Sequence, residues 1–146
     1  MVHVLFVCTG NTCRSPMAEA ILKSMKIEGL EVKSAGVFTS DGLPASTNAQ
    51  KVLDKEKIPH SHQSTQLTEE TIRWADYILT MTRGHKQLIV DLYPDSKGKI
   101  YTLKEFAGET EDLDISDPFG GSLEIYEQTY KEIFRYIEKA IEKLPK

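Results

Sequence analysis

Apolar residues follow one another almost without a break at residues 2–7 and again at 77–81. Such runs are typical of strands that are buried on both faces of a parallel sheet. Residues 30–34 alternate between apolar and polar side chains, and residues 98–103 include Ile100, Tyr101 and Leu103, so we expect two more strands there. The hydrophobic pattern therefore predicts a sheet of four strands.

Helical patterns separate these strands. Polar residues able to cap a helix precede three of the patterns, and their hydroxyls can accept a backbone hydrogen bond. The predicted helices are residues 17–27, residues 45–55, a helix capped by Thr68, residues 83–92 capped by Thr82, and a long final helix capped by Ser122. The apolar stripe of the final helix begins at Ile125, and Trp74 is expected in the core.

Strands that alternate with helices indicate a mainly parallel sheet with helices on both faces, joined by right-handed crossovers. A chain of 146 residues is long enough to bury one core. We therefore expect a single α/β domain over residues 1–146. Ligands of such sheets bind beyond the carboxyl ends of the strands.

The segment between the first strand and the first helix, residues 8–15, falls at such a strand end. Ser15 can cap the helix, and Pro16 would then occupy its first position. Backbone N–H groups at the start of a helix, together with the helix dipole, favour a bound anion. The segment therefore predicts a tight loop that binds a phosphate-sized anion.

The residue types inside the loop fit that chemistry. Gly10 and Asn11 readily adopt left-handed backbone angles, which lets successive N–H groups face one centre. The planar guanidinium of Arg14 can hold two phosphate oxygens. Cys8 would lie under this positive field as a nucleophilic thiolate, and the Ser15 hydroxyl can steady its sulfur. The alternative is that Cys8 is simply a small buried apolar residue.

The segment Cys8-Thr9-Gly10-Asn11-Thr12-Cys13-Arg14-Ser15-Pro16 resembles the phosphate-binding loop of the low-molecular-weight protein tyrosine phosphatase family. The resemblance continues in Ser34-Ala35-Gly36 and in Asp117-Pro118-Phe119-Gly120-Gly121-Ser122, so it spans nearly the whole chain. Within the family, Thr12 and the Phe-Gly-Gly after Asp117-Pro118 resemble the branch of bacterial protein arginine phosphatases.

The resemblance implies a role for each matching residue. Cys8 would be the nucleophile, Arg14 would bind the transferred phosphoryl group, and Asp117 would be the general acid and then the base. Ser34 and His62 would orient the loop from outside. The residues implied to bind the phosphate or the substrate are Thr9, Gly10, Asn11, Thr12, Cys13, Arg14, Ser15 and Phe119. No metal or other cofactor is implied.

The implied activity is hydrolysis of phosphoarginine in proteins through a phosphocysteine intermediate, and phosphotyrosine is the alternative substrate. A polar threonine at position 12 suits a P–N bond and a guanidinium group, to which Asp117 can also hydrogen-bond. Thiol-dependent arsenate reductases share the fold, but they need further cysteines that residues 14–146 lack. A phosphate-binding module or thiol redox sensor without turnover is the remaining class, although Asp117 would have no purpose in it.

The chain has two cysteines, both in the same loop. Because the loop curls around a small anion, the sulfurs of Cys8 and Cys13 can approach each other. We hypothesise a reversible disulfide that switches the enzyme off and protects the thiolate from irreversible oxidation. Packing alone is the equally plain alternative for Cys13.

Composition and charge limit the partners and the location. With 40% hydrophobic residues, 27% charged residues and a net charge of −4, the chain has no basic run for nucleic acid and no apolar run long enough for a membrane. We expect a cytoplasmic monomer that acts on phosphorylated proteins. His60 and His62 show a metal-like spacing, but no further ligands accompany them.

Overall fold

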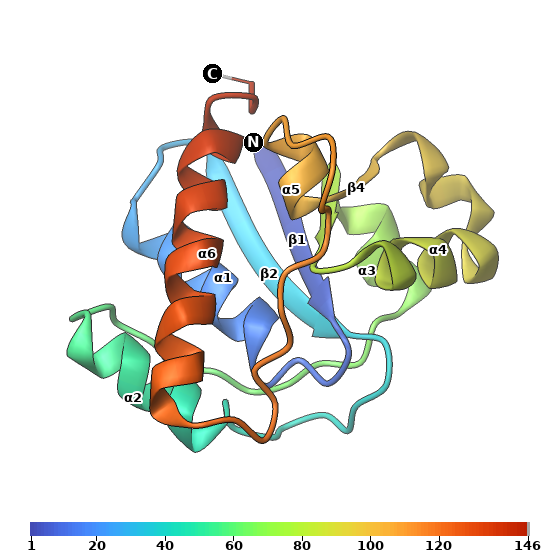
Figure 1. Ribbon diagram of the computed structural model, residues 1–146. Coiled ribbons are helices and arrows are strands. Elements are labelled where there is room, and N and C mark those ends of the chain that lie inside the picture. The colour runs from blue at the N-terminus through green and yellow to red at the C-terminus, as the bar shows by residue number, and fades with distance from the viewer. Residues whose placement is uncertain (146) are drawn as a thin grey trace.

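The computed structural model describes residues 1–145, so Lys146, the last residue of the predicted domain, lies outside it. The four strands are β1 (Val2–Cys8), β2 (Leu30–Gly36), β3 (Tyr77–Thr80) and β4 (Ile100–Thr102). They form one parallel sheet in the order β2-β1-β3-β4 (Figure 1). The predicted four-stranded parallel α/β fold is confirmed.

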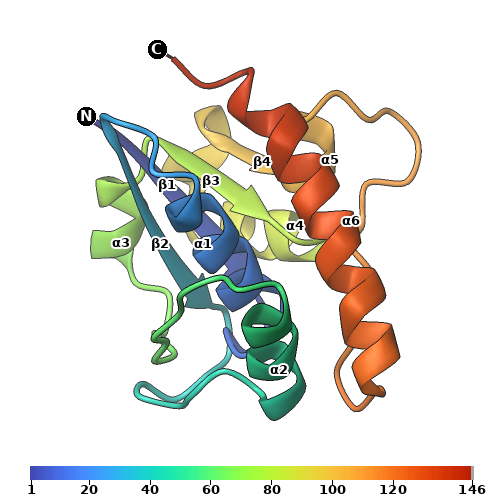
Figure 2. The ribbon, with the colours of Figure 1, turned by 90° about the vertical axis from the view of Figure 1, so that its left-hand side faces the viewer.

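Helices cover both faces of the sheet (Figures 1 and 2). One face carries α1 (Arg14–Ser24), α2 (Thr47–Lys55), the short α5 (Leu103–Phe106) and α6 (Leu123–Ile141). The other face carries α3 (Glu69–Trp74) and α4 (Arg83–Leu92), and α4 is followed by the 3₁₀ turn η1 (Pro94–Gly98). None of the described helices is both long and apolar enough to cross a membrane.

The alternation of side chains along β1 determines where its last residue points. Leu5 and Val7 belong to the apolar cluster beneath α3 and α4, whereas Phe6 and Cys8 belong to the larger cluster beneath α1 and α6. Successive side chains of a strand point to opposite faces of the sheet, so Cys8 points to the same face as Phe6, toward the start of α1.

Three predicted helix caps are confirmed. Thr68, Thr82 and Ser122 each accept a hydrogen bond from the backbone N–H three residues later. The predicted cap at Ser15 is wrong, because α1 begins at Arg14 and has no side-chain cap. The Ser15 hydroxyl instead contacts the side chains of Cys8 and Asn11 inside the loop.

Two predicted core positions are corrected. Ile125 is 45% exposed, because it lies in the first turn of α6, which extends beyond the end of the sheet (Figure 1). Trp74 is only partly buried at the edge of the smaller apolar cluster. Its ring stacks on His3 at 4.5 Å between centroids, and the Lys33 ammonium lies over its face.

Candidate active site

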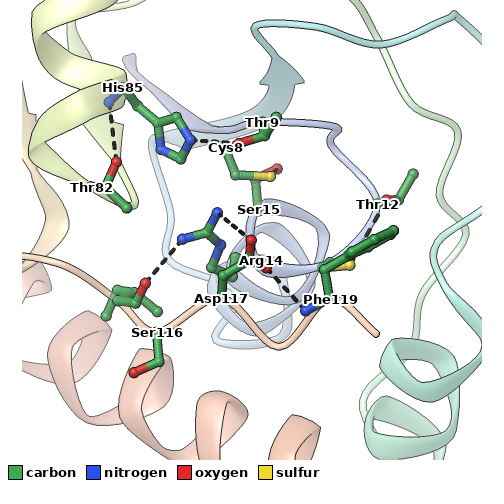
Figure 3. A network of polar contacts seen from close by, with 12 residues as sticks. Cys8, Thr9, Thr12, Arg14, Ser15, Thr82, His85, Ser116, Asp117 and Phe119 are labelled. Atoms are coloured by element: carbon green, nitrogen blue, oxygen red, sulfur yellow. Dashed lines mark hydrogen bonds and ion pairs between the residues drawn. The ribbon is translucent and has the colours of Figure 1, made fainter. Parts of the chain in front are cut away.

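The loop between β1 and α1 forms one wall of a cavity of about 220 Å³. The uncapped first turn of α1 leaves the start of the helix without a side-chain hydrogen-bond partner, as an anion site requires. The cavity is lined by Cys8, Thr9, Gly10, Thr12, Cys13, Arg14, Asp117 and Phe119. All eight belong to the residues that the sequence predicted for the site, and Figure 3 shows most of them.

Asn11 holds the curled loop in shape. Its backbone has a φ of 56°, the left-handed conformation expected from the sequence. Its side-chain amide donates to the hydroxyls of Ser15 at 2.8 Å and Ser34 at 2.9 Å, and its side-chain oxygen accepts from the N–H of Thr65. Asn11 is fully buried, which strengthens these hydrogen bonds. Because Ser34 belongs to β2, they connect the loop to the end of that strand.

His62 supports the same residue from the backbone side. Its Nε2 donates to the carbonyl oxygen of Asn11 at 2.6 Å, and its Nδ1 lies 3.7 Å from the carboxylate of Glu19. Glu19 also accepts from the hydroxyl of Ser34. Burial alone would raise the pKa of Glu19, but hydrogen bonds from His62, Lys23 and Ser34 outweigh it and lower the pKa to about 2. The carboxylate therefore stays charged.

Glu19 was not among the predicted site residues. The available signal is an acid that interrupts an apolar helical segment, where a charge needs a partner.

Cys8 lies at the base of the cavity with 2% of its surface exposed. Its sulfur is 2.9 Å from the Ser15 hydroxyl. Because Ser15 already accepts from Asn11, its own hydrogen is free to be donated to the sulfur. The buried hydroxyl is thus suited to stabilise a thiolate.

Arg14 connects the loop to the segment that carries Asp117 (Figure 3). Its Nη1 donates to the carbonyl oxygen of Ile115 at 2.9 Å, and its Nη2 lies 3.7 Å from Asp117. The Arg14 side chain is 5% exposed, whereas that of Asp117 is 57% exposed. Asp117 accepts a 3.0 Å bond from the N–H of Phe119, which fixes the carboxyl at the open side of the cavity.

Cys13 and Phe119 complete the walls. Cys13 is buried. Its sulfur lies 3.2 Å from the hydroxyl of Tyr126 and 3.7 Å from that of Ser46. Phe119 is 79% exposed, so its ring is available to a substrate. Tyr126 was not among the predicted site residues, and its contact with Cys13 joins residues 113 positions apart.

Thr9 connects the cavity to His85, which was also not among the predicted site residues. Its hydroxyl lies 2.8 Å from Nε2 of His85, a buried residue in the first turn of α4. Burial and the positive charge of Arg14 lower the pKa of His85 to about 4, against the attraction of Asp114 and Asp117. The imidazole is therefore neutral at ordinary pH.

Residues 1–145 contain no group of three or more His, Cys, Asp and Glu side chains that is arranged to hold a metal ion. His60 instead pairs with Asp54 at 2.8 Å, while His62 serves the loop. The cavity therefore combines a thiol, a guanidinium, open backbone N–H groups and a carboxyl group. This combination can bind a phosphoryl group, attack it and supply a proton to its leaving group.

Residues 3–146 match the family model described as "Low molecular weight phosphotyrosine protein phosphatase". A protein-arginine-phosphatase of Geobacillus stearothermophilus is 50% identical over 97% of this chain and 95% of its own length. The low molecular weight protein-tyrosine-phosphatase PtpB of Staphylococcus haemolyticus is 42% identical over 94% of this chain and 96% of its own length.

A solved structure has a closely similar backbone. It is a mutant of YwlE arginine phosphatase in which serine replaces the active-site cysteine and is phosphorylated. Its TM-score is 0.93 at 42% identity, over 98% of this chain and 95% of that one.

Proposed function

The chain belongs to the low molecular weight phosphotyrosine protein phosphatase family, and from this premise we propose that it hydrolyses phosphoarginine in proteins. The observation that carries the proposal is the buried Cys8 thiol, which faces a cavity shared with Arg14 and Asp117. A phosphorylated residue at the active-site position of the YwlE mutant supports a covalent phosphoenzyme in this family.

In the first step, the sulfur of Cys8 attacks phosphorus and the bond from phosphorus to the leaving nitrogen breaks. Arg14 and the loop N–H groups bind the phosphoryl oxygens, where charge accumulates in the transition state. Asp117 donates its proton to the departing guanidine nitrogen, since an unprotonated one leaves slowly. The products are phosphocysteine and a free arginine side chain.

In the second step, Asp117 removes a proton from a water molecule that attacks the phosphocysteine. The sulfur–phosphorus bond breaks, and inorganic phosphate and the Cys8 thiolate are released. The Ser15 hydroxyl, 2.9 Å from the sulfur, stabilises the thiolate as it leaves. The exposed position of Asp117 at the open side of the cavity suits both the leaving group and the water.

Phosphoarginine is favoured over phosphotyrosine for two reasons. The relative named protein-arginine-phosphatase is 50% identical, against 42% for the relative named protein-tyrosine-phosphatase. Thr12 also lines the cavity with a small polar side chain, which leaves room for a guanidinium group that can hydrogen-bond to Asp117. Phosphotyrosine remains the second candidate, because the family model carries that name.

The substrate test compares phosphate release from a phosphoarginine protein and from a phosphotyrosine peptide under reducing conditions, with Cys8→Ser as the blank. We expect a strong preference for phosphoarginine. Preference for phosphotyrosine would overturn the substrate while leaving the mechanism in place. Release from neither substrate would favour a phosphate-binding module or thiol sensor.

Thr12→Ile tests the proposed selector, with Thr110→Ile, at an exposed threonine in the loop after α5, as the matched control. A larger apolar side chain in the cavity should reduce phosphoarginine hydrolysis by tenfold or more relative to phosphotyrosine hydrolysis. An unchanged ratio of kcat/KM for the two substrates would remove Thr12 as the selector.

The proposal also covers the setting of the reaction. Phosphorylated proteins are the proposed partners, and neither nucleic acid nor a membrane is proposed for a chain of net charge −4. The mechanism needs Cys8 as a free thiol, which a reducing cytoplasm maintains. All eight residues that line the cavity come from one chain, so a monomer suffices.

A further inference from the structure

We propose that His85 is a positioning residue that turns the hydroxyl hydrogen of Thr9 toward the cavity, where Thr9 becomes an additional donor to the phosphoryl group. The inference rests on the proposed function only in requiring that the cavity binds a phosphoryl group. It does not depend on whether the substrate is phosphoarginine or phosphotyrosine.

Thr9 is well placed for this contact. It directly follows Cys8 and lines the same cavity as Cys8 and Arg14. Its Oγ1 lies 2.8 Å from Nε2 of His85, whose ring reaches across from the start of α4 (Figure 3). Within residues 1–145 this is the single polar contact recorded for the Thr9 hydroxyl, so one further hydrogen-bonding direction stays available to a ligand.

The two nitrogens of the His85 ring determine which atom donates. Nδ1 is buried and has no hydrogen-bond partner among the described residues. A buried N–H without an acceptor costs about 1–3 kcal/mol and is rare, so the hydrogen of the neutral ring belongs on Nε2. Nε2 then donates to Thr9 Oγ1, and the threonine hydrogen is left free for another acceptor.

His85 is buried, and the backbone that carries its ring is anchored. It is 8% exposed, and the backbone N–H of His85 donates to the Thr82 hydroxyl that caps α4. The N–H of Arg83 donates to Asp114, which precedes the segment that carries Asp117. The charged groups facing the ring are Arg14, Asp114 and Asp117. Burial and the positive charge of Arg14 outweigh the two aspartates and keep the ring neutral, with a pKa of about 4.

The test uses inorganic phosphate as a competitive inhibitor of aryl phosphate hydrolysis. Thr9→Val keeps the shape of the side chain and removes the hydroxyl, and we expect the inhibition constant to rise about tenfold, as for a lost hydrogen bond to a charged group. His85→Leu leaves the hydroxyl free among three staggered positions, so the expected rise is about threefold. His85→Gln, which can present a donor near the position of Nε2, should restore most of that loss.

The double variant separates positioning from general damage. If His85 acts through Thr9, Thr9→Val with His85→Leu should behave like Thr9→Val alone. The single variants Thr9→Val and His85→Leu should each raise KM for the aryl phosphate more than they lower kcat. His60→Leu, which removes a histidine that pairs with Asp54 outside the cavity, is the matched control.

A direct measurement does not depend on the folding of any variant. The ¹⁵N resonances of the His85 ring in the wild-type protein should show hydrogen on Nε2 and a bare Nδ1. Hydrogen on Nδ1, an unchanged phosphate inhibition constant in Thr9→Val, or additive losses in the double variant would each overturn the inference. Failure of the wild-type protein to hydrolyse phosphoarginine would overturn the substrate proposal alone.

Discussion

Asp117 shows how much of the proposed chemistry depends on one carboxyl group. It lies 3.7 Å from Arg14, yet more than half of its side chain is exposed. Asp117→Asn keeps an oxygen that can accept from the N–H of Phe119 and removes the proton that the leaving group needs. We expect kcat to fall by roughly a hundred- to ten-thousand-fold.

Steady-state kinetics on aryl phosphates of different acidity would measure this effect. The loss should shrink as the leaving phenol becomes more acidic, since such a group departs without a proton. Asp95→Asn, at an exposed aspartate in η1, is the control. A loss that stays the same for every leaving group would contradict the acid role.

Cys13 is the predicted partner of Cys8 in a reversible disulfide, which can be tested by oxidation. It shares the cavity with Cys8, and both are free thiols in the structure. Under mild peroxide, the Cys8 thiolate should form a sulfenic acid, which condenses with the Cys13 thiol to a disulfide and releases water. Intact mass should then show the loss of two hydrogens, and Cys13→Ser should instead gain oxygen. Oxygen adducts alone on the wild-type protein would refute the disulfide.

At the scale of elements, the end of β2 determines the path of the loop after β1. A Cβ atom on Gly36 would lie 2.7 Å from the carbonyl oxygen of Thr9 and 3.0 Å from the N–H nitrogen of Asn11. These are backbone atoms, which cannot move away as a flexible side chain does. The absence of a side chain at position 36 therefore lets strand and loop pack directly together.

Gly36→Ala should displace the loop. We expect kcat/KM to fall tenfold or more and the free energy of unfolding to drop by about 1–3 kcal/mol. Kinetics and chemical denaturation would measure the two effects. Gly98→Ala is the matched control, because a Cβ atom there meets nothing within 4 Å. Wild-type kinetics in Gly36→Ala would show that the loop does not depend on this close contact.

At the scale of the whole molecule, acid should weaken the fold in two stages. His85 has its pKa lowered from 6.5 to about 4, so the unfolded chain binds its proton first and stability falls as pH drops from about 6.5 to 4. Glu19 has its pKa lowered from 4.5 to about 2, so its contribution is lost between about pH 4.5 and 2. Each stage is worth up to about 3 kcal/mol.

Denaturant titrations at pH 7, 5 and 3 would follow both stages. Glu19→Gln should flatten the lower stage and leave the upper one, whereas His85→Gln should do the reverse. Glu69→Gln, at an exposed glutamate of α3, is the control. Stability that rises as the pH falls from 6.5 to 4 would contradict the buried neutral state of His85.

Features that depend only on residues close together in the chain could be predicted from the amino-acid sequence. Apolar runs and their period predict the four strands and the main helices, because each pattern reports which faces of one element are buried. The hydroxyls of Thr68, Thr82 and Ser122 cap helices that start at the next residue, so their roles are local too. The short α5 and η1 lack a long enough pattern to be predicted.

The residues of the candidate site also differ in how far a local sequence pattern predicts them. Cys8 and Arg14 follow from one continuous loop motif, whereas Asp117 came only from the family resemblance, since it lies more than 100 positions away. The cavity brings the three together.

The side chains that support the site from distant parts of the chain could be identified only in the folded structure. His85 reaches Thr9 across 76 positions and Tyr126 reaches Cys13 across 113, and no local pattern connects either pair. The sequence predicted Ser15 as a helix cap, but in the folded loop its hydroxyl contacts the side chains of Cys8 and Asn11. The physical reason is that a buried polar atom takes the partner that folding places beside it, and sequence separation carries no information about that partner.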